Sequence, residues 1–507
     1  MKRIVPIFLC TAMIFSLLTG CNTPEDPYVP TGDGLSATVT GQPEDDSRPE
    51  QQPIKLVYDP EHPLNPYQAT SMTNRVLLSL VYQGLFAVDR SSKVSPILCE
   101  SYNVSADMKT YTFYVADALF SDGTALTAED VAASLRAAQK SVWYGGRLRH
   151  VSAISCYGEA VVVELSTALE NFPILLDIPI VKASQVDAER PLGTGPYRYD
   201  GDQLRRQAGW WCQAALSVHS DTIALVAAQT ASQIRDSFEF QGTSLVCADP
   251  SARDYVEFHN DYELWDCENG LFLYLVCNSK SSVFSNDTLR AALTYAIDRD
   301  SLAETYYRGF ARSATLPCSP QSPHYISSLA AKYHYAPQAF QEALEDTGLA
   351  GSQIKLLLNA DDATRTKVGK AIAGKLTELG LTVTIVEATS KNFTELLEKG
   401  DYDLYLAQTR LPRNMDISAF FGMDTSLNYG GLSDPGIYAI SLEALANTGN
   451  YYTLYEMVME DAQLCPILFQ SHAIYAQRGA FDHLDPTRDA IFYYDLGRSL
   501  EDALIRE

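Results

Sequence analysis

Three ionisable side chains stand close together in the segment Gln408–Asp416, which reads Gln-Thr-Arg-Leu-Pro-Arg-Asn-Met-Asp. Arg410 and Arg413 carry planar guanidinium groups, which suit bidentate binding of carboxylates and phosphates, and Asp416 adds a carboxylate. The segment follows a predicted strand, Tyr402–Ala407, and ligands of open parallel sheets bind beyond the carboxyl ends of the strands. We therefore predict a binding site here. Pairing of both arginines with nearby acids on a solvated loop is the alternative.

Further candidate ligand contacts lie on other segments of the chain. A loop after the first predicted strand would face the arginines across a cleft, and tyrosines could form its walls with rigid, amphipathic surface. The candidates are Tyr67, Thr70 and Ser71 from the loop, and Tyr274 and Tyr429 from the walls. For each single tyrosine, packing in the core or on the surface is the competing explanation.

Signatures of common enzyme classes are absent from the sequence, which contains no His-Glu-x-x-His, Gly-x-Ser-x-Gly or Walker motif. The eight histidines lack the i, i+4 pairs typical of helical zinc sites, and no Cys-x-x-Cys occurs. We therefore predict a binding protein without catalytic residues, metal or cofactor. An exported hydrolase, whose nucleophile and base are brought together only by folding, is the competing class.

The composition restricts the class of protein further. The chain has 507 residues, and 38 Lys and Arg against 63 Asp and Glu give a formal charge of −25. This balance argues against nucleic-acid binding, because a phosphate-binding surface needs clustered basic residues. At roughly 100–200 residues per domain, the chain should form two or more lobes. No apolar run approaches the ~20 residues of a spanning helix, so a multi-pass membrane protein is excluded.

The N-terminus has the pattern of an export signal. Basic residues precede the apolar stretch Ile4–Leu18, which fits the hydrophobic region of a secretory signal peptide. The following Leu18-Thr19-Gly20-Cys21 resembles a bacterial lipobox. In such signals, cleavage leaves the cysteine as the new N-terminus with two acyl chains on its sulfur, which suffice for stable anchoring. We predict a signal peptide at 1–20, lipidation of Cys21, and attachment to the extracytoplasmic face of a bacterial membrane.

A linker follows the predicted anchor. Residues 21–53 are rich in proline and acidic residues and poor in aromatics, so they cannot bury enough apolar surface to fold. The folded part should begin near Ile54. Eight cysteines lie beyond Cys21, and an exported chain can form disulfides, for example between Cys267 and Cys277. Buried free thiols are the alternative, and the sequence leaves both open.

Hydrophobic periodicity predicts a mixed α/β fold. In the first half we predict strands at 54–58, 111–115 and 160–165, a helix at 72–83, and a second helix that begins with a capping box of Thr127 and Asp130. A further strand is expected at 271–277. The second half then alternates strands at 354–358, 381–386 and 402–407 with helices at 364–379 and 392–399. This order implies parallel strands joined by right-handed crossovers.

Several short motifs follow one another in an order that spans nearly the whole mature chain. They are Pro96–Tyr102, Thr110–Phe113, Phe120–Thr124, Leu126–Val131, Gly193–Tyr197, Leu289–Leu293, Ala296–Arg299, Gly309, Gly400–Leu404 and Cys465–Ile467. In this order they resemble the signature of the peptide/nickel-type (family 5) solute-binding proteins of ABC transporters, similar to oligopeptide- and dipeptide-binding lipoproteins.

The resemblance implies a periplasmic-binding-protein-like fold (type II, cluster C), with lobes of mixed sheet and helices around a hinged cleft. Lobe I would combine residues 54–88, 191–270 and 476–507, while lobe II would be residues 89–190 and lobe III residues 271–475. Lobes I and III would close around a solute and deliver it to the permease subunits of an ABC importer. The protein would act as a monomer.

A peptide-like solute is what the resemblance implies by default. In peptide-binding relatives, the loop after the strand at 402–407 often holds an aspartate that pairs with the α-ammonium of the peptide. Arg413 stands at that position here, and an arginine repels an ammonium group and favours an anion. The alternatives are a sensory or adhesive lipoprotein with this fold, or a binder of an anionic or metal-chelate solute.

Overall fold

The computed structural model describes residues 54–213, 220–423, 425–481, 484 and 486–492, all of which belong to one compact unit. The predicted signal peptide, Cys21 and the linker lie outside the described residues. The predicted mixed α/β class is confirmed. None of the described helices is both long and apolar enough to cross a bilayer.

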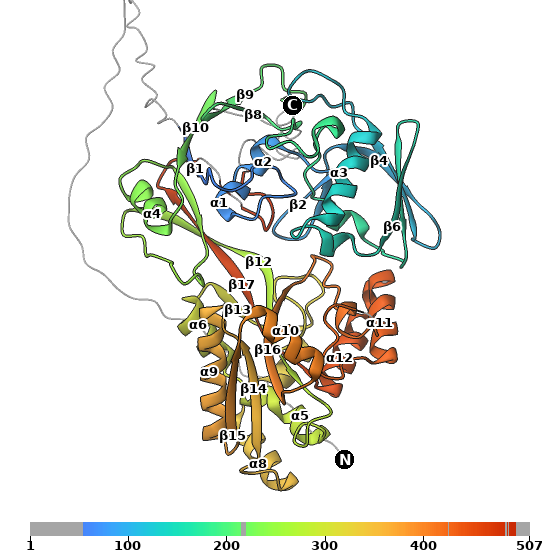
Figure 1. The fold of residues 1–507 in the computed structure, drawn as a ribbon. Helices are drawn as coiled ribbons and strands as arrows, with labels where there is room; N and C mark the ends of the chain where they lie inside the picture. Colours follow the sequence, from blue (N-terminus) through green and yellow to red (C-terminus); the bar gives the residue numbers. More distant parts are fainter. Residues whose placement is uncertain (1–53, 214–219, 424, 482–483, 485, 493–507) are drawn as a thin grey trace, which may run out of the picture. The chain divides into compact units, whose positions relative to one another are not determined.

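An eleven-stranded mixed sheet runs through the unit (Figure 1). Its strands, in their order across the sheet, are β15 (Thr382–Ala388), β14 (Gln353–Asn359), β16 (Leu404–Arg410), β12 (Tyr262–Cys277), β17 (Leu464–Gln477), β11 (Leu245–Ala248), β1 (Lys55–Tyr58), β10 (Thr222–Ala227), β9 (Gln203–Arg206) and β8 (Tyr197–Asp200), while β13 (Ala311–Ser313) pairs with β17. The strands β12 and β17 are the longest, with 16 and 14 residues, and they connect the two ends of the sheet.

A bulge interrupts the antiparallel pairing of β12 with β17. The register shifts between Glu268 and Phe272, and Gly270 within this stretch has φ +76°, a left-handed conformation that glycine adopts without strain. The bulge divides the structure into two halves. We refer to the described residues of 54–268 and 471–492 as part A, and to those of 272–469 as part B.

Part B contains the β-α-β-α-β unit that the sequence predicted. The strand β14 pairs in parallel with both β15 and β16, and the connecting helices are α9 (Ala363–Glu378) and α10 (Ser390–Lys399). These predictions are confirmed. The strand β16 extends further than predicted, through Arg410, because its ladder with β12 continues to the pair Leu271–Arg410.

The remaining helices of part B cover the faces of its sheet. They are α5 (Asp287–Leu293), α6 (Arg299–Tyr307), α7 (Ser327–Ala330), α8 (Pro337–Thr347), α11 (Pro435–Ala446) and α12 (Tyr451–Asp461). Alternate residues of β12 enter two cores: Leu273 and Leu275 pack on one face, and Phe272 and Tyr274 pack on the other. A strand that is buried on both faces is therefore apolar without interruption.

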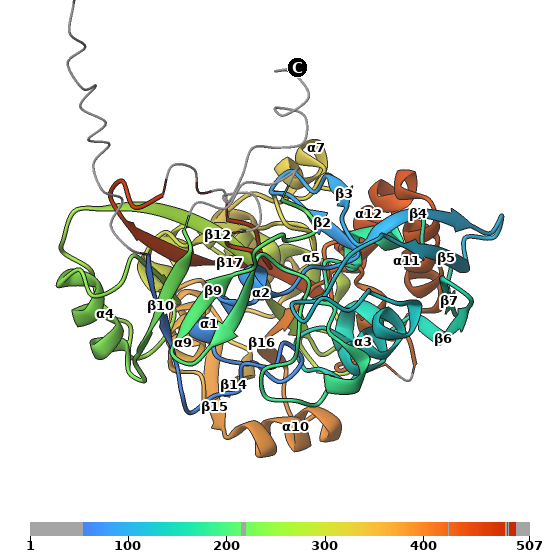
Figure 2. The same cartoon turned by 90° about the horizontal axis from the view of Figure 1, so that it is seen from above.

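Part A adds a four-stranded antiparallel sheet, which lies beside the helix α3 in Figure 2. In order, this sheet contains β4 (Cys99–Val104), β5 (Thr110–Val115), β7 (Ala160–Leu165) and β6 (Val151–Tyr157). The helix α3 (Ala128–Lys140) begins with the predicted capping box, in which Thr127 and Asp130 each accept a backbone N–H of the other. Further elements are β2 (Phe86–Val88), β3 (Val94–Pro96) and α4 (Ala231–Glu239).

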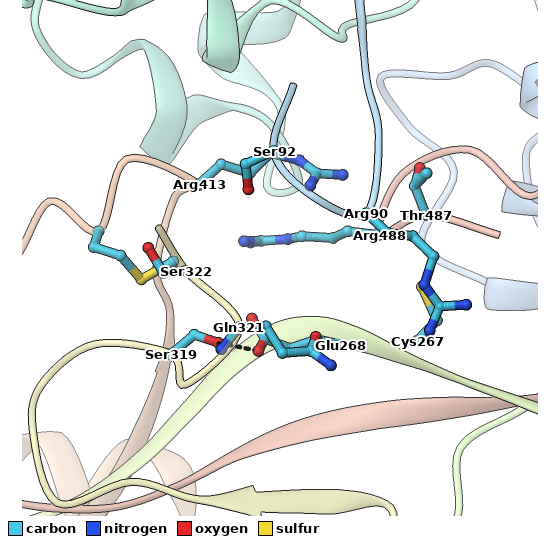
Figure 3. Close-up of a pocket in the computed structure, with 11 residues that line it drawn as sticks. Arg90, Ser92, Cys267, Glu268, Ser319, Gln321, Ser322, Arg413, Thr487 and Arg488 are labelled. Atoms are coloured by element: carbon cyan, nitrogen blue, oxygen red, sulfur yellow. Dashed lines mark hydrogen bonds between the residues drawn. The ribbon is translucent and has the colours of Figure 1, made fainter. Parts of the chain in front are cut away.

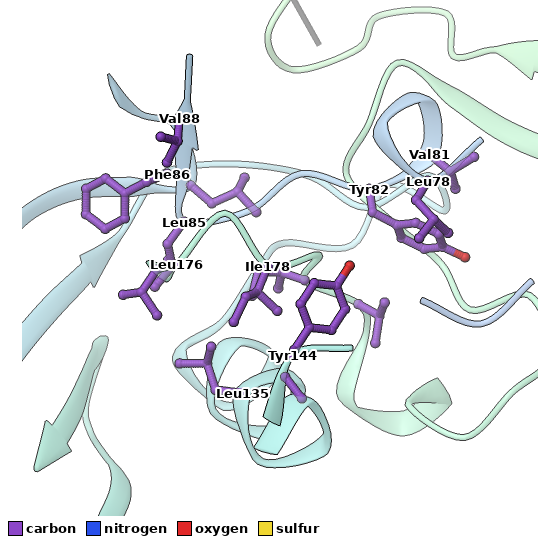
Figure 4. Close-up of a cluster of buried hydrophobic side chains, with 14 of the residues drawn as sticks. Leu78, Val81, Tyr82, Leu85, Phe86, Val88, Leu135, Tyr144, Leu176 and Ile178 are labelled. Carbon is purple, nitrogen blue, oxygen red and sulfur yellow. The ribbon is translucent and has the colours of Figure 1, made fainter. Parts of the chain in front are cut away.

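The predicted helix at 72–83 is wrong as a continuous element. The structure has two short helices instead, α1 (Met72–Arg75) and α2 (Leu78–Val81). Val81 ends the second helix because its carbonyl accepts the N–H of Gly195 at 3.0 Å. A Cβ on Gly193 would lie only 2.1 Å from the same oxygen, so this close approach needs glycine. Figure 4 shows Leu78 and Val81 of α2, and Tyr82 directly after the helix, in the largest core of part A.

All eight cysteines of the described part are free thiols. Cys267 and Cys277 lie at different places on β12 and are both buried. Of the two possibilities that the sequence left open for this pair, the structure therefore has buried free thiols, which behave as small apolar side chains.

Candidate functional site

A cluster of arginine and carboxylate side chains lies where parts A and B meet. Its centre is Arg147, which follows α3 in a short 3₁₀ turn (Gly145–Leu148) and is fully enclosed. One guanidinium nitrogen, Nη1, donates to Asp177 Oδ1 at 2.6 Å, and the other, Nη2, donates to Asp489 Oδ1. All three side chains belong to part A, although they come from three distant segments of the chain.

Arg413 reaches this cluster from part B. Its Nε lies 3.4 Å from Asp177 Oδ2, and its Nη2 lies 3.6 Å from Asp489 Oδ2. These are ion pairs, but neither nitrogen donates a hydrogen bond to any described residue, although both are buried. Asp489 Oδ2 likewise accepts none. The cluster therefore has unused donors and an unused acceptor, which are costly in a protein interior.

The guanidinium group of Arg488 packs against Gly270 in the bulge of β12. Its Nη2 donates to the carbonyl of Leu411 at 2.7 Å, and a Cβ built on Gly270 would lie 2.1 Å from its guanidinium carbon. Only glycine leaves room for this side chain. Next to the bulge, Glu268 accepts a hydrogen bond from the hydroxyl of Ser319 in part B.

An indole ring separates two further arginines. The guanidinium carbon of Arg75 lies 3.7 Å from the centre of the Trp143 ring, and that of Arg410 lies 4.0 Å from it. Such cation–π contacts stabilise cations that have left water. The Trp143 Nε1 donates to Asp489 Oδ1 at 3.4 Å, which joins this stack to the rest of the cluster.

The cluster carries more positive than negative charge. Its cations are Arg75, Arg147, Arg410, Arg413 and Arg488, and its carboxylates are Asp177, Asp489 and Glu268. Burial lowers the pKa of Arg410 to about 9, with Arg488 as the next cause, and burial lowers that of Arg488 to about 10. Buried cations without full compensation favour the uptake of an anion.

The two aspartates respond differently to this environment. Burial raises the pKa of Asp177 to about 6, with the nearby Asp489 adding to the effect. Burial opposes ionisation of Asp489 too, but Arg147, Arg413 and Arg488 outweigh it and hold its pKa far below the usual range. Asp489 is therefore the carboxylate that the arginines hold as an anion.

Small cavities adjoin the cluster. One of about 50 Å³ is lined by Arg90, Arg413 and Arg488, and by Glu268 and Ser319 across from them. Figure 3 shows these basic side chains on one side of the cavity and the Ser319–Glu268 hydrogen bond on the other. Two more, of about 40 and 20 Å³, lie on other sides of Asp489. Since a water needs ~10–15 Å³ by this measure, each cavity holds a few waters at most.

His472 lines the smallest of these cavities, together with Cys247, Cys267 and Asp489. Its side chain is buried, and neither ring nitrogen has a hydrogen-bond partner among the described residues. Burial lowers the pKa of His472 to about 4, so the imidazole is neutral at physiological pH. A neutral imidazole offers one donor and one acceptor to a molecule that enters the cavity.

The structure brings two of the predicted site residues, Arg410 and Arg413, into this cluster. Asp416, from the same segment, lies in a separate buried group, where it pairs with Arg149 and with His150 Nε2 at 2.8 Å. It lines none of the cavities described above.

The other predicted site residues lie apart from the cluster. Tyr67 is buried and donates to the carbonyl of Pro179 at 2.7 Å, while Thr70 is exposed and Ser71 is half-buried before α1. Tyr274 is buried in the core of part B, edge-on to Phe420, and Tyr429 packs at the border of that core. None of these five lines one of the three cavities.

Sequence reasoning missed most of the cluster. Arg147 stands in the run Gly145–His150, where three basic residues follow two glycines. In an acidic chain this local concentration was a usable signal. Asp177 and the neighbouring pair Arg488 and Asp489 belong to no motif, and only the fold brings them to Arg147.

The arrangement suits noncovalent binding of an anion. The arginines supply guanidinium donors. Glu268 and His472 supply acceptor atoms for a hydrogen-bond donor or an amine of the ligand. Within the described residues, no group of three or more His, Cys, Asp or Glu is placed to hold a metal ion.

Comparisons with known proteins assign the chain to a family. Residues 93–429 match the family described as bacterial extracellular solute-binding proteins, family 5 (its middle region). The glutathione-binding protein GsiB of Escherichia coli K12 is 26% identical over 340 residues, which cover 63% of this chain and 66% of GsiB. The alignment thus spans just under two thirds of that relative.

Solved structures share the fold. A putative peptide-binding protein, AppA from Clostridium difficile, superposes with a TM-score of 0.71 at 16% identity and covers 89% of this chain and 99% of its own. NikA from Brucella suis, solved with Fe(III)-EDTA, gives 0.69 at 18% identity and covers 88% of this chain and all of its own. The predicted resemblance and the predicted binding-protein fold are confirmed: the chain belongs to the family 5 bacterial extracellular solute-binding proteins.

Proposed function

We propose that the chain is a lipid-anchored, extracytoplasmic solute-binding protein that captures a peptide-like solute and delivers it to the permease of an ABC importer. Family membership supports the role of a carrier. The sequence pattern of a lipobox supports the anchor at Cys21. The solute is held without a covalent step, and no residue acts as a catalyst.

The observation that carries the proposal is the arginine cluster at the boundary between parts A and B. Arg147 and Asp489 come from part A and Arg413 comes from part B, and their ion pairs join the two parts. In the proposed division, part A contains lobes I and II and part B corresponds to lobe III. A solute bound among these side chains would touch both jaws, so its binding would stabilise the closed form.

We further propose that the solute carries carboxylates. The cluster has an excess of cations, and Arg413 stands where an aspartate would receive a free amine in peptide-binding relatives. Glutathione is the first compound to test, because GsiB relatives are 26% identical and because it is an acidic peptide. Its carboxylates would meet the arginines, and its ammonium group would meet Glu268.

A thermal-shift and calorimetric screen of the purified full chain in mild detergent tests this proposal. Glutathione, dipeptides, amino acids, sugars and metal chelates are the compounds to compare. A ligand at 100 times its Kd stabilises the folded protein by about 2.7 kcal/mol. We expect acidic peptides to raise the melting temperature, and Arg413→Ala to abolish the shift.

The control is Arg478→Ala, which removes an exposed arginine that pairs with Asp261 at the surface. It should leave binding unchanged. If neutral free-amine peptides bind and Arg413→Ala leaves their binding intact, the role given to Arg413 is wrong. If no compound of these classes binds, the proposed carrier function fails.

The anchor has its own test. Cys21→Ser should release the protein from the membrane into the medium or periplasm, because the lipid-bearing sulfur is gone. A mutant that stays on the membrane would contradict the lipobox assignment.

A further inference from the structure

The segment Pro486–Ala490 lies between the three small cavities and separates them. Thr487 lines all three, Arg488 lines two, and Asp489 lines two. If the segment moved aside, the cavities would open into one another. No single one of them, at about 50 Å³ or less, has room for a peptide-like solute.

The segment is held mainly by its own side chains. It belongs to no helix or strand, and its Thr487 N–H bonds within the segment, to the carbonyl of Ala490 at 2.8 Å. Its links to the rest of the molecule include the ion pairs of Asp489 and the hydrogen bond that Asp489 accepts from Trp143. Arg488 packs against Gly270 and donates to the Leu411 carbonyl at 2.7 Å, and Cys267 Sγ makes a weak contact with the Pro486 carbonyl at 3.6 Å.

The residues on either side are fixed more firmly. Leu484, Ile491 and Phe492 are buried in the core of part A. A short segment between such anchors can change its path without unfolding the core. Arg488 and Asp489 would leave together, and because their charges are opposite, the remaining cluster would keep its excess of cations.

Asp489 also has the contacts that a bound anion would have. Its carboxylate lies against Arg147, Arg413 and the Trp143 indole, which come from both parts. One Asp489 oxygen and two nitrogens of Arg413 lack a hydrogen-bond partner among the residues that the structure describes. A carboxylate from outside, free of the geometry of the chain, could satisfy these groups better.

We propose that the Asp489 side chain occupies the position of a solute carboxylate, and that a carboxylate-bearing solute binds by displacing Pro486–Ala490 and by taking the place of the Asp489 side chain on Arg147 and Arg413. This inference rests on the proposed function and adds to it a state of the site in which Asp489 occupies the place of the solute. The segment lowers the apparent affinity, because only the displaced form can bind.

Calorimetric titration with succinate tests the proposal on the full chain. Asp489→Asn keeps the shape of the side chain but removes its charge, so we expect succinate to bind about tenfold more tightly than to the wild type. The control is Asp261→Asn, which removes the same charge from the surface, where Asp261 pairs with Arg478. It should change the affinity by less than about threefold.

Each result has a definite meaning. Equal tightening by both variants would show a general effect of net charge and overturn the displacement. Weaker binding to Asp489→Asn would show that Asp489 helps to hold the solute, which also overturns it. If the wild type binds acidic peptides but the two variants behave alike, the inference fails and the proposed carrier function stands.

A second measurement needs no variant. Cys267 is buried beneath the segment, whereas Cys277 and Cys318 are buried within part B. Succinate should speed the reaction of Cys267 with N-ethylmaleimide in the folded wild type, and leave Cys277 and Cys318 unreactive, as read by peptide mass spectrometry. Sodium chloride at equal ionic strength should have no such effect. Protection of Cys267 by succinate, or an unchanged rate, would contradict displacement.

Discussion

Asp416 and Asp489 are two buried aspartates that each bind arginine where parts A and B meet. Asp416 pairs with Arg149 and His150 and also accepts the N–H of Ser418 at 3.0 Å, so both of its oxygens are used. Asp489 faces several arginines, yet one of its oxygens has no hydrogen-bond partner within the described part of the chain, and cavities adjoin it.

The difference lies in how completely each charge is satisfied. A buried ion pair contributes to stability only when its remaining donors and acceptors are also bonded. The Asp416 group meets this condition, because both carboxylate oxygens are bonded. The Asp489 group does not meet this condition, and its unused donors on Arg413 lie beside a cavity. A buried aspartate–arginine ion pair therefore holds parts A and B together at Asp416, whereas at Asp489 a carboxylate from outside can replace it.

The largest effect should follow removal of Arg147, the common partner of Asp177 and Asp489. Arg147→Ala leaves both carboxylates buried without their nearest cation, which should lower the free energy of unfolding by about 3–5 kcal/mol. Urea denaturation at pH 7 measures the loss. A loss within 1 kcal/mol of zero would mean that the cluster is hydrated and that its charges matter little.

Asp416→Ala should cost somewhat less, about 3 kcal/mol, because Arg149 is partly exposed and can regain water. No added anion should restore this loss, since Asp416 lines none of the three cavities beside the arginine cluster. Denaturation with and without succinate checks both points. Recovery of stability with succinate would remove the distinction between the two aspartates.

Gly270→Ala should have an intermediate effect on stability and the opposite effect on binding. The new methyl group would overlap the Arg488 guanidinium and would stand on a backbone with positive φ, at a cost of about 1–3 kcal/mol. Because the overlap weakens the hold on Pro486–Ala490, succinate should bind more tightly. Gly348→Ala is the control, with a similar φ and no close neighbour. If Gly270→Ala, but not Gly348→Ala, bound succinate more weakly, packing of Arg488 against Gly270 would not be what holds Pro486–Ala490 in place.

The smallest effect concerns His472, which lines a cavity together with Asp489. Burial lowers the pKa of His472 to about 4, below its unfolded value, so the unfolded chain binds the proton first as the pH falls. Stability contributed by the neutral ring is present above pH 6.5 and is lost on acidification, by about 1 kcal/mol between pH 6 and pH 5. His472→Asn should lack this component.

Denaturation midpoints of both proteins across pH 5–7 measure that slope. The control is the exposed His334, whose replacement by Asn should leave the slope as in the wild type. An identical slope for His472→Asn and the wild type would show that His472 is hydrated or bonded in solution.

Much of the fold could be predicted because short-range patterns decide it. The unit β14–α9–β15–α10–β16 follows from alternating apolar runs, and the α3 helix follows from its capping box. The prediction of one helix at 72–83 was wrong because a loop segment distant in sequence, Gly193–Gly195, donates a hydrogen bond to the Val81 carbonyl. A local pattern contains no information on such a contact.

The site was predicted only in part for the same reason. Arg410 and Arg413 were found because they follow a recognisable strand. The carboxylates that pair with Arg413, Asp177 and Asp489, lie more than 70 residues away in sequence, and neither stands in a motif. Asp416 was chosen from the correct segment, but its side chain lies among Arg149 and His150 instead.

Hydrogen–deuterium exchange of the full chain, with and without saturating succinate, tests the central claim most directly. The account predicts faster exchange at the amides of Thr487 and Ala490, whose hydrogen bonds lie within the displaced segment, and slower exchange at Arg413–Met415 and Ser319–Ser322, which line the cavity. Slower exchange at Thr487 and Ala490 together with the cavity walls would contradict it, because the segment would then close over the solute and keep its place.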